Sequence, residues 1–267
     1  MTEFSNEDIE RYGRQIILRD IGSSGQEKIK NAKILCLGAG GLGSPAAFYL
    51  TAAGAGTIGI VDSDNVDLTN LQRQILHKTS DVGKAKVESA KNTLTELNPN
   101  VEIKCFNERL TPKNAREIVK QFDVVIDGCD NFETRYVVND ACFLEEKPVV
   151  YGAVFQFEGR ATVFSKGGPC YRCVFPKPPK SGSVPSCSQA GVLGAVTGVI
   201  GSIQAAEAIK LVIGKGETLQ GRLAIYDALT ANFSEIKLKK DDSCALCGKQ
   251  PSITEVKLPQ TYKTCIE

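Results

Sequence analysis

Residues 33–64 read KILCLGAGGLGSPAAFYLTAAGAGTIGIVDSD, and this stretch decides the fold. An apolar run over 34–37 is typical of a buried strand. Gly38, Gly40 and Gly43 follow in G-x-G-x-x-G spacing, and the small residues after them predict a helix over 44–53. A second apolar run over 57–61 predicts another strand, which ends at Asp62. The stretch therefore predicts one βαβ unit.

Each part of this unit suits a nucleotide. Glycines let the backbone turn tightly and approach a phosphate, whose charge then lies at a helix N-terminus. An acid at the end of the second strand, about 20 residues after the glycines, can bind a ribose hydroxyl. Because strand, glycines, helix and Asp62 all fall where such a site needs them, we predict nucleotide binding rather than an ordinary glycine-rich turn.

The rest of the chain extends this unit into a larger sheet. Apolar segments over 101–105, 122–126 and 146–154 predict further strands, separated by helical patterns. One helix should open at Lys84 and Lys86, and another at Pro112, after Thr111. This order is that of an α/β fold with a Rossmann-like, doubly wound, mostly parallel sheet. Two hairpins, the first turning at Glu158 and Gly159, should continue the sheet with antiparallel strands.

The bulk properties limit the function. The 267 residues fit one large domain, with a nucleotide-binding half over 1–154, a second half over 155–248 and a tail over 249–267. A net charge of +1 predicts no binding to nucleic acid or acidic membranes. The polar N-terminus predicts no secretory signal, so the ten cysteines should lie in a reducing cytoplasm. The apolar stretch 192–213 is long enough to span a membrane, but Gln204, Glu207 and Lys210 favour a core or subunit-interface helix.

Four cysteines form two C-x-x-C pairs, the arrangement that a tetrahedral zinc site requires: Cys170 and Cys173, then Cys244 and Cys247. Redox dithiols or coincidence are the alternatives. The wide gap between the pairs predicts a structural zinc that ties distant segments together. Four other cysteines should be buried and unreactive: Cys36, Cys105, Cys129 and Cys142.

Two further residues are less clear from the sequence. Cys187 falls in a Pro/Ser/Gly-rich loop over 176–190, where it is either an exposed nucleophile or an incidental thiol. His77, the single histidine, has no partner that the sequence reveals, and we interpret it as structural.

Polar residues gather at the predicted carboxyl edge of the sheet. Asn70 and Arg73 follow the second strand, and Lys86 opens the next helix. Asp130 follows a later strand, where it either caps a helix or holds a metal. A dehydrogenase would use Asp62 for NAD but lacks an obvious proton donor here. Reaction at the α-phosphate of ATP needs cations and an acid for Mg²⁺, and so explains more of these residues.

Seven segments together resemble a known family: RYGRQIIL, GAGGLGS, VDSDNVDLTNLQRQ, VGKAKVESA, DGCDN, PCYRC and CALCG. They are similar to signatures of the MoeB/ThiF/HesA adenylyltransferases, which activate ubiquitin-like sulfur carriers. The resemblance runs from about residue 5 to 248. It implies that ATP and Mg²⁺ bind with the C-terminal Gly-Gly carboxylate of a MoaD/ThiS-type carrier protein. The products would be a carrier acyl-adenylate and pyrophosphate, for molybdopterin or thiamine biosynthesis.

The resemblance also implies residue roles. Gly41 would approach phosphate and Asp62 would bind ribose, while Asp130 would place Mg²⁺. The phosphates would be held by Asn70, Arg73 and Lys86.

Spacing alone favours a solvated basic face for Arg11 and Arg14, which lie on a predicted helix over 6–18 whose apolar face carries Ile9, Tyr12 and Ile16. The resemblance instead places Arg14 in the neighbouring subunit's site, across a homodimer interface. The four paired cysteines would be the family's zinc ligands, and the carrier tail would pass under the loop over 176–190. Cys187 matches a cysteine that takes part in sulfur transfer in some members. A separate sulfur donor is expected, because the sequence shows no sulfurtransferase domain.

Two other functions stay open at this stage. A related enzyme could activate a tRNA-modification carboxylate, although the near-neutral charge disfavours tRNA. A non-catalytic nucleotide-sensing scaffold is the other alternative, and it would have no need of Arg73, Lys86 and Asp130 together.

Overall fold

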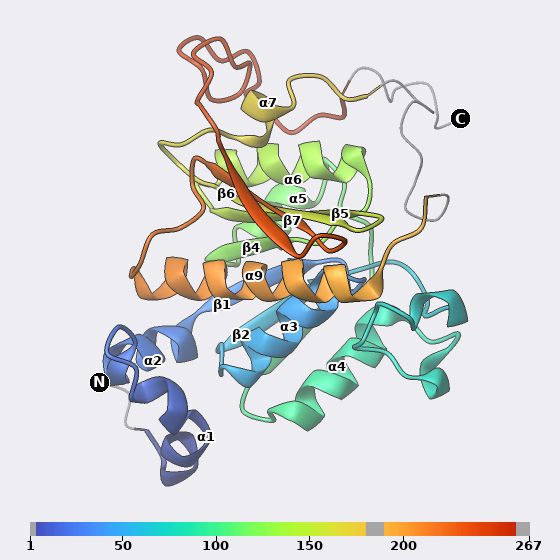
Figure 1. Cartoon of the computed structure of the whole chain (residues 1–267), viewed down its shortest axis with the longest axis vertical. Coiled ribbons are helices and arrows are strands. Elements are labelled where there is room, and N and C mark those ends of the chain that lie inside the picture. The colour runs from blue at the N-terminus through green and yellow to red at the C-terminus, as the bar shows by residue number, and fades with distance from the viewer. Residues whose placement is uncertain (1–3, 180–189, 260–267) are drawn as a thin grey trace.

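The computed structural model describes residues 4–179 and 190–259, and one sheet runs through this part of the chain (Figure 1). Its strand order is β3-β2-β1-β4-β5-β6-β7-β8. Pairing is parallel from β3 to β5 and antiparallel from β5 to β8. The predicted mixed α/β sheet, parallel first and antiparallel afterwards, is confirmed.

The parallel half of the sheet holds the predicted βαβ unit. Its strands are β1 (Lys33–Leu37), β2 (Thr57–Val61), β3 (Glu102–Phe106), β4 (Val124–Asp127) and β5 (Val149–Phe155). At the carboxyl end of β1, Leu37 pairs with Val61 on one side and with Asp127 on the other. Strand order reverses here, and ligands of open α/β sheets bind in the crevice at such a point.

Helices connect the parallel strands: α3 (Gly43–Ala52), α4 (Lys86–Leu97), α5 (Ala115–Val119) and α6 (Phe132–Leu144). Helix α4 begins at Lys86, close to the predicted start. Helix α5 begins at Ala115, so the prediction of Pro112 as its first residue is wrong. Residues 112–114 form a turn instead, because the Asn114 carboxamide oxygen accepts hydrogen bonds from the amide and hydroxyl of Thr111.

Helices cover both faces of the sheet (Figure 1). Ile34 and Cys36 of β1 point to a core shared with α2 (Gly22–Asn31), α3, α4 and α9 (Gly194–Ile213). Leu35 and Leu37 point to a second core with α5, α6 and α7 (Tyr171–Val174). The doubly wound arrangement follows from this alternation. Cys105 is exposed, against the prediction, because β3 is the outermost strand and lacks a neighbour on one side.

The first hairpin turn of the antiparallel half does not lie where the sequence predicted it. β6 (Glu158–Phe164), β7 (Arg222–Asp227) and β8 (Asn232–Lys237) extend the sheet. Phe155 pairs with Glu158, so residues 156 and 157 form the turn, with Gln156 at φ 53°. Gly159 instead lies within β6, where a Cβ atom would approach Ile200 to 2.3 Å. The glycine serves close packing of α9, and the predicted turn at 158–159 is wrong.

Helix α9 is long and apolar enough to pass as a membrane span by length and composition, and half of its apolar window is buried against the protein. It lies lengthwise on the sheet in Figure 1, against α3, β5 and β6. Its polar residues serve internal contacts. Gln204 Nε2 donates to the carbonyls of Asp127 and Val150, both at 2.9 Å, and Glu207 accepts the amide of Leu219 at 2.8 Å. The predicted core helix is confirmed.

Short elements complete the nucleotide half: α1 (Asn6–Ile16) and the 3₁₀ turns η1 (Leu68–Asn70) and η2 (Thr79–Asp81). In α1, Tyr12 is buried but Ile9 is 53% exposed, so the predicted apolar face packs only in part. Beyond residue 249, Ile253 and Val256 pack against the protein.

Candidate nucleotide site and cysteine cluster

The glycine turn joins β1 to α3. Gly38 has φ 91°, which favours glycine. A Cβ on Gly43 would lie 1.8 Å from the carbonyl oxygen of Gly38, so the turn closes only without a side chain there. Helix α3 has no side-chain cap at its N-terminus. Its dipole can therefore favour a phosphate anion there, although the amide of Ser44 already donates to the carbonyl of Gly40 and Pro45 has no N–H.

Asp62 lies directly beside this turn. One carboxylate oxygen accepts the amide of Ala39 at 2.8 Å, and the other accepts the amide of Asp64 at 2.9 Å. Each oxygen of a carboxylate can accept more than one hydrogen bond, so Asp62 can still bind a hydroxyl group. The structure thus joins Asp62 to the glycine turn, as the spacing predicts.

The segment after β2 contributes cationic and amide side chains. Lys86 is buried at the first position of α4, and its Nζ lies 3.0 Å from the exposed carboxylate of Asp64. Arg73 Nη1 donates to the carbonyl of Thr69 at 3.0 Å. Asn70 Oδ1 accepts the amide of Asp67 at 3.1 Å. Within the described residues the ion-pair partner of Lys86 is a solvated acid, Asp64, so an incoming anion could replace that partner.

The DGCDN segment after β4 touches the glycine turn. The amide of Gly128 donates to the carbonyl of Leu37 at 3.0 Å, and a Cβ on Gly38 would lie 3.1 Å from the Gly128 carbonyl oxygen. Asp130 is exposed beyond this contact. The cap of α6 is Asn131, whose Oδ1 accepts the amide of Thr134 at 2.9 Å. The interpretation of Asp130 as a helix cap is therefore wrong.

A buried arginine that the sequence did not single out lies under this segment. Arg135 Nη2 donates to the carbonyl of Cys129 at 2.6 Å, and Nη1 lies 3.8 Å from the carboxylate of Asp127. Its guanidinium lies over the ring of Tyr151, 4.7 Å from the centroid. From the sequence alone, an arginine in the first turns of a helix is expected on the surface. No sequence pattern could therefore have identified this contact.

The cysteines near the sheet are buried thiols. Burial raises the pKa of Cys36 to about 12 and raises the pKa values of Cys129 and Cys142. The prediction that these three are small apolar residues rather than nucleophiles fits this environment. Cys187 lies outside the described residues, as does most of the loop predicted over 176–190.

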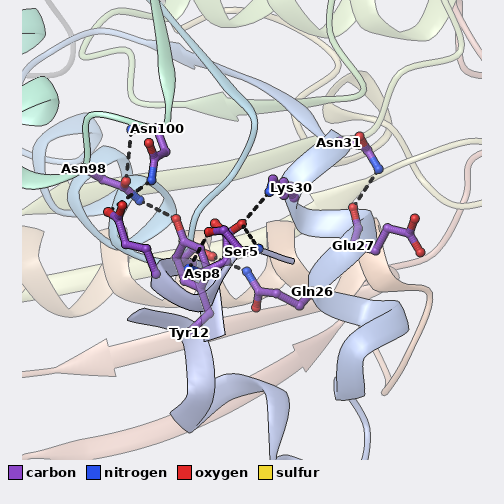
Figure 2. Close-up of polar contacts among 11 residues, drawn as sticks. Ser5, Asp8, Tyr12, Gln26, Glu27, Lys30, Asn31, Asn98 and Asn100 are labelled. Atoms are coloured by element: carbon purple, nitrogen blue, oxygen red, sulfur yellow. Dashed lines mark hydrogen bonds and ion pairs between the residues drawn. The ribbon is translucent and has the colours of Figure 1, made fainter. Parts of the chain in front are cut away.

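Arg14 is not near the residues above. Its helix α1 is held by polar contacts with α2 and with Asn98 (Figure 2). Asp8 pairs with Lys30 at 2.7 Å, which lowers the pKa of Asp8, and the hydroxyl of Tyr12 accepts from Asn98 at 2.8 Å. Gln26 donates to the carbonyl of Ala53 just beyond α3 at 2.9 Å.

Helix α3 has ten residues, so its two ends lie about 15 Å apart. Arg14 is exposed, whereas Arg11 bonds the carbonyl of Leu97 at 3.2 Å. Within one chain the structure therefore does not bring Arg14 to the glycine turn.

The four paired cysteines meet on the other side of the sheet, where α7 lies beside the C-terminal segment (Figure 1). The Sγ atoms of Cys170 and Cys173 are 3.9 Å apart, those of Cys170 and Cys244 3.6 Å, and those of Cys173 and Cys247 3.3 Å. Four thiolates at zinc–sulfur distances of about 2.3 Å in a tetrahedron are about 3.8 Å apart. The cluster has the ligand number and spacing of a structural zinc site.

The glycine turn, the acid after β2 and the switch point between β1 and β4 define a nucleotide-binding α/β protein. Its family can also be given: residues 12–246 match the model of the ThiF family, and the chain belongs to that family.

The similar proteins agree with this. The chain is 47% identical over 259 residues to the sulfur carrier protein adenylyltransferase of Thermus thermophilus, covering 95% of this chain and 96% of that protein. It is 49% identical over 258 residues to the adenylyltransferase and sulfurtransferase MOCS3 of Culex quinquefasciatus. The match covers 96% of this chain but 59% of MOCS3, so the chain spans little more than half of that relative.

A solved structure of Escherichia coli MccB with MccA-N7isoASN shares the fold, with a TM-score of 0.81 at 23% identity over 91% of this chain and 76% of that one.

Proposed function

We propose that this chain is an ATP-dependent adenylyltransferase that activates the C-terminal carboxylate of a small ubiquitin-like sulfur carrier protein. The observation that carries the proposal is the meeting of the glycine turn, Asp62, Lys86 and the segment bearing Asp130 at one sheet edge. Membership of the ThiF family and 47% identity to a sulfur carrier protein adenylyltransferase support it.

In this proposal the sheet edge binds ATP with its base and ribose toward β2. Asp62 accepts a hydrogen bond from the ribose, and the glycine turn with Gly40 and Gly41 leaves room for the phosphates. The uncapped N-terminus of α3 favours their negative charge. Lys86 exchanges Asp64 for a phosphate oxygen, and because Lys86 is buried, this charge pair is screened little by water.

The reaction is a displacement at the α-phosphorus. A carboxylate oxygen of the carrier forms a bond to that phosphorus, and the bond to the oxygen bridging the α- and β-phosphates breaks. The electron pair leaves with pyrophosphate, so negative charge grows on the β-phosphate. In this proposal Arg73, Lys86 and Asn70 stabilise this charge, and their cation and amide groups on the segment after β2 support the assignment.

Asp130 is the residue that would hold Mg²⁺. Its carboxylate is exposed and leaves the capping of α6 to Asn131. Oxygen ligands of this kind suit Mg²⁺, which would neutralise phosphate charge when bound. Asp127 is a poor candidate because it is 2% exposed and lies beside Arg135.

The cysteine cluster would hold one structural Zn²⁺, supported by its sulfur spacing. The amide of Asp241 also points to the Sγ of Cys173 at 3.4 Å, a contact that stabilises a thiolate. Four protein ligands leave no position for substrate, so we assign no chemistry to this site.

We propose that the carrier docks on the half over 155–248. Phe155, Phe157 and Leu193 are each at least 40% exposed. They lie together because the amide of Leu193 donates to the carbonyl of Gln156 at 3.0 Å. Partly exposed aromatic and aliphatic side chains near the start of α9 suit an apolar partner surface.

Three further parts of the proposal concern the assembly and its setting. A homodimer would bring the partner subunit's Arg14 to the site. A separate sulfurtransferase or desulfurase would supply sulfur. The eight described cysteines are free, which supports a reducing cytoplasmic location.

ATP–pyrophosphate exchange tests the function. Purified protein is incubated with ATP, labelled pyrophosphate and carriers that end in Gly-Gly, and a carrier lacking the last glycine is the control. We expect exchange only with the intact carrier. Exchange without carrier, or none with any intact carrier although ATP binds, would contradict the proposal.

A further inference from the structure

The single histidine lies between the glycine turn and helix α4. His77 is 6% exposed. Its Nε2 lies 2.9 Å from the carbonyl oxygen of Ala39, in the turn itself, and its Nδ1 lies 2.9 Å from the hydroxyl of Ser89 on α4. The sequence predicted a structural histidine without a partner, but the structure gives it two partners on different elements.

These contacts continue on both sides of the imidazole. On one side the amide of Ala39 donates to Asp62, so both polar backbone groups of Ala39 are held. On the other side Ser89 contacts the carboxylate of Asp81 at 2.8 Å, and Asp81 pairs with Lys84 at 2.9 Å. One chain of contacts thus links the glycine turn to the N-terminal part of α4, which begins at Lys86.

We propose that His77 is a positioning residue for the nucleotide: it fixes the Ala39 carbonyl and thereby holds the glycine turn at a set distance from Lys86. This rests on the proposed nucleotide site. If the turn shifted, its glycines and Lys86 could not contact the same triphosphate together, and misplacement of about 1 Å is costly in such sites.

The proton on the imidazole follows from its partners. A carbonyl only accepts, so Nε2 must carry hydrogen and donate to Ala39. Burial lowers the pKa of His77, and so does the charge of Lys86, while Asp62 and Asp81 raise it. The lowered pKa favours the uncharged ring at neutral pH, and the single hydroxyl hydrogen of Ser89 then lies toward either Nδ1 or the carboxylate of Asp81.

Nucleotide binding should change the pKa of His77. Phosphates that pair with Lys86 would cancel the positive charge that opposes protonation of His77. The pKa of His77 should therefore rise when a nucleotide binds. Because the chain has one histidine, its imidazole signals in a nitrogen–proton NMR spectrum need no assignment.

Three variants separate positioning from stability. His77→Phe removes the donor, and His77→Gln keeps an N–H donor near the Nε2 position. Thr93→Val is the matched control: Thr93, also on α4, donates to the carbonyl of Leu76, next to His77, but does not touch the glycine turn. Each protein is measured for thermal unfolding and, by calorimetry, for binding an ATP analogue with a methylene bridge between the α- and β-phosphates.

We expect His77→Phe to weaken analogue binding about tenfold, because the Ala39 carbonyl loses its 2.9 Å donor and keeps only the longer contact from Ser44 Oγ at 3.4 Å. His77→Gln should restore binding to within about threefold of wild type. Thr93→Val should lower the melting temperature but leave binding unchanged. In the wild type the NMR spectrum should show the Nε2–H tautomer and a pKa that rises with the analogue.

Two results would overturn the inference. One is a folded His77→Phe protein that binds the analogue as well as wild type, and the other is an equal loss of binding in Thr93→Val. Both leave the proposed function intact. A wild-type protein that binds no analogue would instead overturn the proposed function, and the positioning role with it.

Discussion

Two acids in the segment DGCDN differ in environment, and this difference supports different proposed roles for them. Asp127 ends β4, is 2% exposed and accepts the amide of Cys129 at 3.0 Å. Asp130, three residues later, is exposed and contacts Asn131 Nδ2 at 3.3 Å. An acid that binds a metal ion must be accessible to that ion, whereas a buried acid beside an arginine shapes the backbone. We therefore propose the first role for Asp130 and the second for Asp127.

Substituting adjacent residues should separate activity from stability. We expect Asp130→Ala to lower carrier-dependent exchange by at least about 10²-fold with an unchanged melting temperature, because an exposed side chain leaves no cavity. Asn131→Ala removes the cap of α6 and should cost about 1 kcal/mol of stability while activity persists. Exchange rates and thermal unfolding of both variants are the measurements, and a fully active Asp130→Ala protein would contradict the assignment.

At this scale the sequence predicted the positions of Asp62 and Lys86 better than the contacts that surround the glycine turn. Asp62 and Lys86 are set by spacing within regular elements, so their places could be predicted. The contacts of His77 with Ala39 and of Arg135 with Cys129 depend on side-chain directions between elements. Such contacts leave no periodic signal, and they appear only when the coordinates are known.

At the level of elements, the junction of η2 and α4 depends on one carboxylate. Asp81 bonds Lys84 and Ser89 and accepts the amide of Lys78, and these contacts lower its pKa from 3.8 to about 2, with Lys84 the main cause. A carboxyl group with a depressed folded pKa stabilises the fold above its unfolded pKa. This stabilisation is lost as pH falls through the folded pKa. It should be complete above about pH 5 and vanish between about pH 4 and 2.

Asp81→Asn should therefore destabilise the protein in a pH-dependent way. After allowance for the solvent around Lys84, whose side chain is 50% exposed, we expect a loss of about 1–2 kcal/mol at pH 7. The difference from wild type should shrink by pH 3. Urea unfolding at pH 7, 4 and 3 measures it, and a difference that stays constant with pH would count against the charge-based explanation.

The packing of α9 on β6 can be tested with two glycines. Gly159 faces Ile200 so closely that an added methyl group needs a shift, and Gly159→Ala should cost about 1–3 kcal/mol. Gly198 lies within α9 with nothing within 4 Å of an added Cβ. Gly198→Ala should stabilise by about 0.5–1 kcal/mol through helix propensity. Equal effects of the two changes in urea unfolding would show that packing is not the cause.

Elements were predictable where the chain has strong local signals. The parallel half follows from apolar runs and helical spacing, and both were read correctly apart from the start of α5. The hairpin turn was misplaced because Glu158 and Gly159 look like turn residues, although Gly159 is required by α9. Cys105 was misjudged because alternation does not tell an edge strand from a central one.

On the scale of the whole molecule, the cysteine cluster joins α7 to the segment after β8. Cys170→Ser should reduce bound zinc from about one ion per chain to little or none, and it should lower the melting temperature by several degrees. Cys105→Ser is the control, since Cys105 is an exposed thiol outside the cluster. Metal analysis and thermal unfolding check both. Equal zinc content in the two variants would refute a zinc site.

The position of Arg14 has a consequence for the assembly. Arg14 lies on α1, which is held at the end of α3 away from the glycine turn, and α3 is about 15 Å long, so its proposed role is a role in a neighbouring subunit's site. In a dimer of Arg14→Ala and Asp130→Ala chains, one site then keeps its own Asp130 and receives an intact Arg14 from the partner. The other site carries both defects.

Mixing these two inactive proteins, after brief unfolding and refolding to exchange subunits, should therefore restore activity. Each heterodimer should have about half of the wild-type exchange rate, because closed two-fold symmetry gives two sites per dimer. Tagged chains allow heterodimers to be purified before the assay. If Arg14 acted within its own chain, every site would carry one defect and the heterodimer would be as inactive as its parents.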